Sequence, residues 1–498
     1  MSLEEAFKTY TNLVQAVIAA SRRDAATTAT INQVTYVVID LKRLVNELEA
    51  NAEFQTLIKI TALNFSKEPY EDTSFGHLLW NQNVKAFFRR SGFYLLAYHG
   101  EIQDTDNAFG RYVEAFQQEK VLIRYLVPLE FVDFGDSPID FGNFRIVQFS
   151  RNDLEALLQT KINKMFYPYA YADLSELSSL WFLEVIETVD AWEPGSGGPV
   201  GLLGPEVGLS FTDFPSQVEY ALKLLALYDW GTYQAPFPAG EHGRQLIAGH
   251  DTGWDRFHIP FIISINESQL WSPTALPDLS VVATQPDVGA DGEEIGERTV
   301  ISMYVETDQF KQEMQRVATI MADIERMRST QWAFLDVALG YLVKAFFASG
   351  LDQLLWHMVV VESLLGDKGD SAEGLTKRLQ RRAAFVVAQN KQEISDKKKL
   401  VRDLYTLRSD MVHGNTKIID SKVYLGHLRA ARELARETSL WLLESLCNLN
   451  KQSSEQTIGD KIPSRKEIIA AIDVLSDDEL DTDNVKFALD VLHTGQTK

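Results

Sequence analysis

Apolar residues recur at three- and four-residue spacing through the C-terminal part of the chain, from residue 308 to about residue 450. This spacing places apolar side chains on one face of a helix. It is clearest in LDQLLWHMVVVESLLGD, LTKRLQRRAAFVVAQ, KKKLVRDLYTLRSDMVHG and LGHLRAARELARETSLWLLESLCNL. We therefore predict an all-helical region over residues 308–450.

The pattern is different before residue 308. Residues 3–63 have helical spacing, whereas residues 77–100 are mixed and hard to assign. Over residues 121–192 the apolar runs are short, rich in β-branched and aromatic residues, and broken by Gly, Pro and Asp, which is typical of strands. A helix over residues 217–231 follows, and FHIPFIISINES and RTVISMYVET are two further predicted strands.

These patterns predict an α+β fold for the chain of 498 residues. Residues 1–305 form a mixed α/β region, helical over 1–63 and strand-rich over 121–305. The helical domain follows over 308–450. Residues 451–498 form a polar linker and a short acidic helical tail. At roughly 100–200 residues per domain, the length fits two to four domains.

Charge divides the chain unevenly. The net charge is −22, which argues against a generally basic nucleic-acid-binding protein. Residues 368–436, however, contain sixteen Lys or Arg and eight Asp or Glu, so this segment is near +8 and the remainder is near −30. The asymmetry indicates either one anion-facing segment or an ordinary solvated helical face.

Several classes of protein do not fit the sequence. A single cysteine, Cys447, excludes an internal disulfide and fits a reducing compartment. The start MSLEEAFKTY lacks the features of a signal peptide, and no uninterrupted apolar run is long enough to cross a membrane. We therefore expect a cytoplasmic protein without a membrane anchor.

Motifs for nucleotides, metals and serine hydrolases are also missing from the sequence. It contains no phosphate-binding loop, nucleophile elbow or H-E-x-x-H helix. His242, His250 and His258 recur eight residues apart, which is no recognised metal-ligand spacing. We expect neither a cofactor nor a metal.

The stretch LYTLRSDMVHGN, residues 404–415, combines Arg408, His413 and Gly414. Five residues turn a regular helix by about 500°, so Arg408 and His413 would lie about 140° apart. Glycine just past a helix end adopts the left-handed conformation that stops the helix. We therefore expect a helix that ends at His413 with Arg408 one and a half turns upstream. A capping histidine and a surface arginine would give the same pattern.

These residue types also suit the cleavage of RNA. An imidazole titrates near neutral pH and can move a proton to or from a hydroxyl. A guanidinium can hold a phosphate and stabilise the charge that develops on it. One histidine supplies only one proton-transfer group, whereas a two-fold homodimer would bring a second copy of the motif across the axis.

The motif resembles the R-x4-H signature of the HEPN superfamily. The wording Y-x-x-R-S-x-x-V-H-G resembles the Apea-like HEPN branch in particular, and the preceding apolar helix that contains Glu362 agrees with that branch. The resemblance covers roughly residues 330–450. It implies an all-α helical-bundle domain that pairs with a second copy. It further implies a metal-independent endoribonuclease that leaves 2′,3′-cyclic phosphate ends, commonly in prokaryotic antiviral defence or toxin systems.

The candidate catalytic residues are Arg408, His413, Glu362 and Ser409. Glu362 is expected to pair with Arg408 or His413, because a carboxylate in an apolar run needs a partner. Many HEPN nucleases carry Asn, Asp or His where this chain has Ser409. The serine also fits a catalytically silent domain.

The candidate RNA-binding residues are Tyr405, Asn415, Lys377, Arg378, Arg381 and Arg382. Tyr405 could instead pack in the core, and Asn415 could instead belong to a turn.

Three functions remain open from the sequence. The first is an endoribonuclease whose N-terminal region, residues 1–305, senses a phage-derived or nucleotide trigger and restrains the helical domain. The second is a silent HEPN module that dimerises and serves as a scaffold. The third is a regulator that binds a nucleotide signal in its N-terminal region.

Overall fold

The computed structural model describes two compact units, each built from separate segments of the chain. Unit 1 comprises residues 1–129, 142–206 and 259–295, and unit 2 comprises residues 130–141, 207–258 and 296–498. The described residues are 1–24, 28–31, 34–37, 41–66, 74–100, 102–130, 132–135, 138–158, 174–190, 212, 214–230, 257–266, 278–281, 303–305, 307–326, 333–367, 372–388, 390–414, 421–455 and 464–474.

Unit 1 begins with helices that share an aromatic core. These are α1 (Leu3–Asp24), α2 (Leu41–Glu49), α3 (Ala52–Phe65), α4 (Ser74–Arg90), α5 (Phe93–His99) and α6 (Thr105–Gln117). Phe7, Phe88 and Tyr112 are fully buried between them. The ambiguous residues 77–100 therefore lie mainly in two helices, α4 and α5, which are separated at Ser91 and Gly92.

One part of the predicted helical segment 3–63 is wrong. Thr28–Ile31 (β1) and Val34–Val37 (β2) pair as antiparallel strands. Their Thr, Val, Tyr and Ile side chains are β-branched or aromatic and favour extended backbone, which outweighs the helical spacing of the flanking residues.

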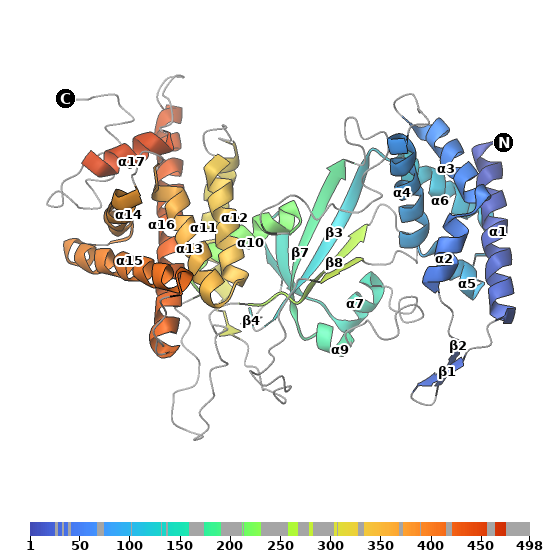
Figure 1. The fold of residues 1–498 in the computed structure, drawn as a ribbon, viewed down its shortest axis with the longest axis horizontal. Helices are drawn as coiled ribbons and strands as arrows, with labels where there is room; N and C mark the ends of the chain where they lie inside the picture. The colour runs from blue at the N-terminus through green and yellow to red at the C-terminus, as the bar shows by residue number, and fades with distance from the viewer. Residues whose placement is uncertain are drawn as a thin grey trace. The chain divides into compact units, whose positions relative to one another are not determined.

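The sheet of unit 1 is antiparallel and is centred on β3 (Lys120–Leu129). The strands that unit 1 contributes to this sheet lie side by side in the order β6 (Phe144–Gln148), β7 (Trp181–Asp190), β3, β8 (Phe261–Asn266) and β9 (Asp278–Val281). Two short helices, α7 (Arg151–Leu157) and α9 (Leu174–Leu177), pack their leucines on one face of this sheet (Figure 1). The strands expected over 121–192 and in FHIPFIISINES are therefore present.

Unit 2 contains short strands and one helix that precede its helical region in sequence. These are β4 (Val132–Asp133), β5 (Ile139–Asp140), α10 (Ser216–Leu227) and β10 (Met303–Tyr304), with β4 and β10 paired in parallel. An aromatic cluster explains why these segments join the later helices. Phe134 contacts Phe310 at 5.0 Å between ring centroids, and Phe257 contacts Trp230 at 5.2 Å and Phe346 at 5.1 Å.

The rest of unit 2 is helical, as the spacing predicts. Its helices are α11 (Thr307–Arg326), α12 (Ala333–Phe347), α13 (Gly350–Leu365), α14 (Ala372–Val387), α15 (Lys391–Val412), α16 (Ser421–Glu455) and α17 (Arg465–Val474). Helix α13 contacts α12, α14, α15 and α16, and the long helix α16 contacts each of the helices from α10 to α15 (Figure 1). The chain thus has an α+β fold with a helical C-terminal region.

The units do not divide at residues 305–308, where the sequence pattern changes. The apolar face of α10 packs against α11, α12 and α16, which places residues from the N-terminal half in unit 2. Residues 452–455 continue α16 and are not a linker, while the second half of the expected helical tail lies outside the described residues. Among the described helices, none is long and apolar enough to cross a membrane.

Candidate functional site

The motif helix α15 begins and ends as its sequence predicts. The side chain of Asn390 accepts a hydrogen bond from the backbone N–H of Glu393 at 3.2 Å and caps the start of the helix. At the other end, the helix stops at Val412, His413 is its C-cap, and Gly414 has a φ of 70°. This left-handed glycine ends the helix directly after the histidine, as expected.

Arg408 lies at the end of the buried stripe of α15. Val401, Leu404 and Tyr405 are buried, and Arg408 follows them at three- and four-residue spacing on the same side of the helix. Its side chain is 30% exposed, so the guanidinium lies where the bundle core meets solvent. Packing of the stripe therefore fixes where the arginine emerges.

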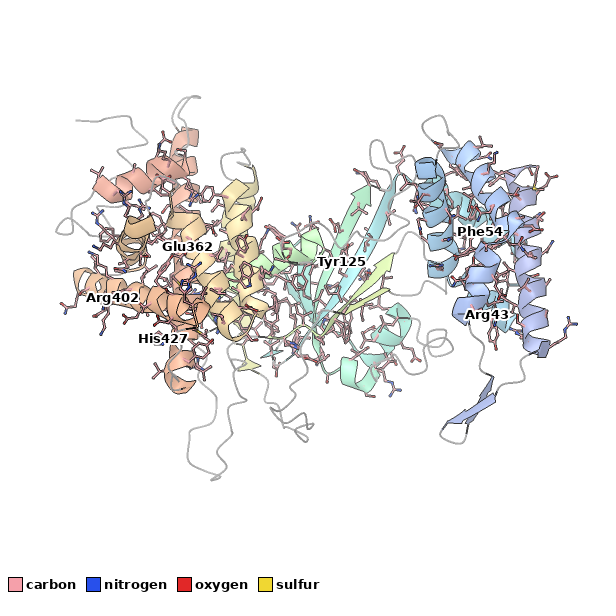
Figure 2. All side chains as sticks on the ribbon, in the orientation of Figure 1. Arg43, Phe54, Tyr125, Glu362, Arg402 and His427 are labelled. Atoms are coloured by element: carbon pink, nitrogen blue, oxygen red, sulfur yellow. The ribbon has the colours of Figure 1, made fainter. Side chains whose placement is uncertain are left out.

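Glu362 meets Arg408 from the last turn of α13. Nη1 of Arg408 donates to Oε1 of Glu362 at 2.6 Å, and the carboxylate is 26% exposed. The ion pair expected from the sequence is therefore present. Figure 2 shows Glu362 among the helices of unit 2. The other guanidinium nitrogens of Arg408 form no hydrogen bond with a described residue, which leaves donors for an anion.

Tyr405 is part of the same cluster, and its burial agrees with the core-packing interpretation. Its hydroxyl donates to Oε1 of Glu362 at 3.0 Å, and the residue is only 8% exposed. A ring buried to this degree cannot stack on a base. Burial, followed by the nearby Glu362 carboxylate, raises the pKa of Tyr405 well above its ordinary value, so the hydroxyl stays a donor.

His413 and Ser409 are both exposed at the end of α15. The backbone N–H of His413 donates to the carbonyl of Ser409 at 3.0 Å, as in a regular helix turn. No hydrogen bond joins the His413 side chain to Arg408 or to another described residue. The helix stays regular to Val412. Asn415 lies outside the described residues.

Arg382, expected to bind RNA, belongs to the core. Its side chain is 1% exposed, and its Nε and Nη2 donate to the two carboxylate oxygens of Asp473 at 2.9 and 2.6 Å. Its Nη1 donates to the carbonyl of Leu365 at 2.9 Å. The interpretation of Arg382 as an RNA contact is therefore wrong, because a buried guanidinium with three such partners cannot reach a phosphate backbone.

The other members of the basic set are more accessible. Lys377 and Arg378 are exposed on α14. Arg381 is half-buried, and its Nη1 donates to the carbonyl of Asp473 at 3.1 Å. Its guanidinium also lies 4.8 Å from the ring of Phe385, and the Lys398 ammonium lies 5.3 Å from the same ring. Positive groups from α14 and α15 thus gather around one aromatic side chain.

Two residues in this part of the unit were missed in the sequence: Arg465 and Asp473, at the two ends of α17. Arg465 donates to the carbonyls of Glu362 and Leu364 at 3.2 and 3.3 Å. A signal for this helix was present, because Ser464 and Glu467 form a capping box and Ile468, Ile469 and Ile472 supply an apolar face.

No metal-ligand cluster is found in the described part of the chain, where no three His, Cys, Asp or Glu side chains are placed to hold an ion. Nδ1 of His258 instead lies 2.8 Å from Oε2 of Glu130. His242 and His250 lie outside the described residues.

Comparison of the chain with protein-family models, with curated proteins and with solved structures finds no match. The cluster of Glu362, Tyr405 and Arg408 and the histidine that ends the same helix are therefore the features from which we infer a function.

Proposed function

We propose that unit 2 carries a metal-independent endoribonuclease site of the Apea-like HEPN type, centred on Arg408 and His413. The observation that carries the proposal is the single carboxylate oxygen of Glu362 that holds both Arg408 and Tyr405. An arginine held by a carboxylate and still 30% exposed is oriented before a phosphate arrives, which is what electrostatic stabilisation of a transition state requires.

The chemistry needs one group to accept a proton and one to donate it. His413 of one copy removes the proton of a 2′-hydroxyl, and the 2′-oxygen attacks the adjacent phosphorus. The bond from phosphorus to the 5′-oxygen breaks, and His413 of a second copy protonates that leaving oxygen. Arg408 stabilises the additional negative charge on the phosphoryl oxygens. The products are a 2′,3′-cyclic phosphate and a 5′-hydroxyl.

A second copy of the chain is the partner that this mechanism needs. The side of α15 that bears Tyr405 and Arg408 continues to Val412, four residues beyond Arg408, and Val412 is 56% exposed. Val423, near the start of α16, is also an exposed apolar residue. Pairing of two copies near this end of α15 would cover apolar surface and bring two His413 side chains to one phosphate.

The basic residues support binding of the RNA strand. Lys377, Arg378 and Arg381 on α14 and Lys398 on α15 supply positive charge within an otherwise acidic chain. Contacts of this kind follow the phosphate backbone and weaken with salt. Regulation by a phage-derived or nucleotide trigger acting on the N-terminal region, in an antiviral defence or toxin system, is part of the proposal.

The test is cleavage of labelled RNA in the presence of a metal chelator, with product ends read by mass spectrometry. Wild type is compared with Arg408→Ala and His413→Ala. The matched controls are Arg402→Ala, an exposed arginine on the same helix, and His427→Ala, whose Nδ1 lies 2.8 Å from a carbonyl of its own helix (Figure 2). We expect a loss of about 100-fold or more in the two motif variants, near-wild-type rates in the controls, and cyclic phosphate ends.

Cleavage that survives His413→Ala would contradict the proposal. Absence of cleavage by the full-length wild type would instead favour a HEPN module that dimerises without catalysis. Sedimentation of wild type and of Val412→Asp then decides whether the exposed end of α15 joins two copies.

A further inference from the structure

The last turn of α13 carries Glu362 and ends without a continuing helix. The final four carbonyls of a helix have no partner within the helix and need one from elsewhere. Here side chains from two other helices supply donors. Arg465 of α17 donates to the carbonyls of Glu362, Leu364 and Gly366, and Arg382 of α14 donates to the carbonyl of Leu365. Cations at this end are also favoured by the helix dipole.

The chain itself closes this turn tightly. The backbone N–H of Gly366 donates to the carbonyl of Glu362 at 2.8 Å. A Cβ atom at position 366 would lie 2.6 Å from that carbonyl oxygen, which only glycine avoids. The carbonyl of Glu362 therefore accepts from Gly366 within the chain and from Arg465 outside it.

Helix α17 is anchored at both ends, so the position of Arg465 is fixed. Its guanidinium lies 5.1 Å from the ring of Phe334 at the start of α12. At the far end, Asp473 forms the bidentate ion pair with buried Arg382. Ile468, Ile469 and Ile472 are buried between these two ends.

We propose that Arg465 is a positioning residue of the candidate ribonuclease site. By holding the carbonyls of the last turn of α13, it fixes the backbone of Glu362 and so the carboxylate that orients Arg408 and Tyr405. Helix α17 begins more than fifty residues after the motif helix ends, and through Arg465 it helps to set the geometry of the site. The effect on RNA cleavage rests on the proposed function.

The experiment compares Arg465→Ala with Lys466→Ala, an exposed neighbour on the same helix that loses the same charge. We expect kcat for RNA cleavage to fall about tenfold to 100-fold in Arg465→Ala with KM nearly unchanged, and to stay at the wild-type value in Lys466→Ala. Millimolar guanidinium is expected to restore part of the lost rate in Arg465→Ala, because it can occupy the vacated position.

A double-mutant cycle separates positioning from a general loss of structure. If Arg465 acts through Glu362, the variant that combines Arg465→Ala with Glu362→Gln is no slower than Glu362→Gln alone. Additive losses, or a kcat in Arg465→Ala equal to that of wild type, would overturn the inference.

Hydrogen exchange makes the inference independent of the reaction. The amide of Gly366 is expected to exchange faster in Arg465→Ala than in wild type or Lys466→Ala, because its acceptor carbonyl is then held less firmly. If wild type cleaves no RNA while Gly366 behaves in this way, the proposed function fails and the positioning of the turn stands. Unchanged exchange at Gly366 would refute the positioning itself.

Discussion

Tyr405 and Arg408, one helical turn apart on α15, donate to the same oxygen atom of Glu362. The two distances to Oε1 are 3.0 Å from the tyrosine hydroxyl and 2.6 Å from Nη1 of the arginine. The guanidinium carbon also lies 5.9 Å from the centre of the tyrosine ring. One carboxylate thus holds a buried donor and a partly exposed cation together, and we expect the activity of the site to depend on the charge of Glu362.

Replacing Glu362 by Gln is the most direct test of this dependence. The amide keeps the shape of the side chain but removes the charge that holds Arg408. A hydrogen bond between charged groups contributes about 1.5–3 kcal/mol, so we expect kcat for RNA cleavage to fall about tenfold to 100-fold. RNA affinity, measured by filter binding, should stay equal or become tighter because a carboxylate near the phosphate is removed.

Glu437→Gln is the control for this variant. Glu437 is a partly exposed carboxylate of the same unit that pairs with Lys397 at 3.3 Å, away from the Glu362 cluster. Equal rates in wild type and Glu362→Gln would show that the carboxylate does not orient Arg408 for catalysis.

Tyr405→Phe separates the hydroxyl from the ring. The phenylalanine keeps the buried packing of the ring and removes one hydrogen bond to Glu362, so we expect a loss of about 1 kcal/mol in the free energy of unfolding. Arg408 retains its own bond to the carboxylate. The cleavage rate should therefore fall by less than in Glu362→Gln.

The same variant should change how stability depends on pH. In the folded protein the raised pKa keeps Tyr405 protonated, whereas the unfolded chain ionises its tyrosines near pH 10. Above that pH the unfolded state binds fewer protons, so the stability of wild type falls as pH rises. Urea unfolding at pH 8 and pH 11 should show a smaller fall for Tyr405→Phe. Equal falls would show that Tyr405 ionises normally in the folded state.

Local sequence signals predicted the helical half of unit 2 because its apolar stripes are long and regular. The same signals could not show that α10 belongs to that unit, because the contacts that join this part of the chain to the later helices are long-range. Trp230, which follows α10, contacts Phe346 more than one hundred positions away, and Phe257 contacts both. Short strands such as β1 were missed because a few β-branched residues lie between two strongly helical segments.

The site was predictable where one helix decides it. The end of α15 at Gly414 and the position of Arg408 follow from spacing and from the conformational freedom of glycine. The burial of Arg382 was not predictable, because a basic residue next to Arg381 is usually exposed. Its partner, the carboxylate of Asp473, lies ninety-one positions away in the sequence. Charge runs read along the sequence therefore overstate the exposed positive surface.

Asp473→Asn tests whether α17 is part of the folded core. The change removes the negative charge from the carboxylate that binds the buried guanidinium of Arg382, and breaking a buried ion pair from one side costs about 3–5 kcal/mol. The exposed ion pair of Asp403 with Arg402 provides the control, and Asp403→Asn should cost less than about 1 kcal/mol. Thermal unfolding of the full chain measures both, and similar midpoints for the two variants would show that α17 is dispensable for the stability of unit 2.

At Glu313 on α11, in contrast to Asp473, we expect removal of the carboxylate to stabilise the fold. Burial raises the pKa of its carboxyl, and this effect outweighs the attraction of Arg436 and Arg316, while Asp229 adds repulsion. A carboxyl with a raised folded-state pKa stabilises the fold fully below about pH 4.3, the unfolded value, and this contribution is lost as pH rises through the folded value. Glu313→Gln should therefore raise the unfolding midpoint at pH 7 and change it little at pH 4. Glu433→Gln, an exposed position on α16, is the control for the loss of one carboxylate charge. A Glu313→Gln variant that is less stable than wild type at pH 7 would show instead that the arginines pair with the charged carboxylate strongly enough to offset its burial.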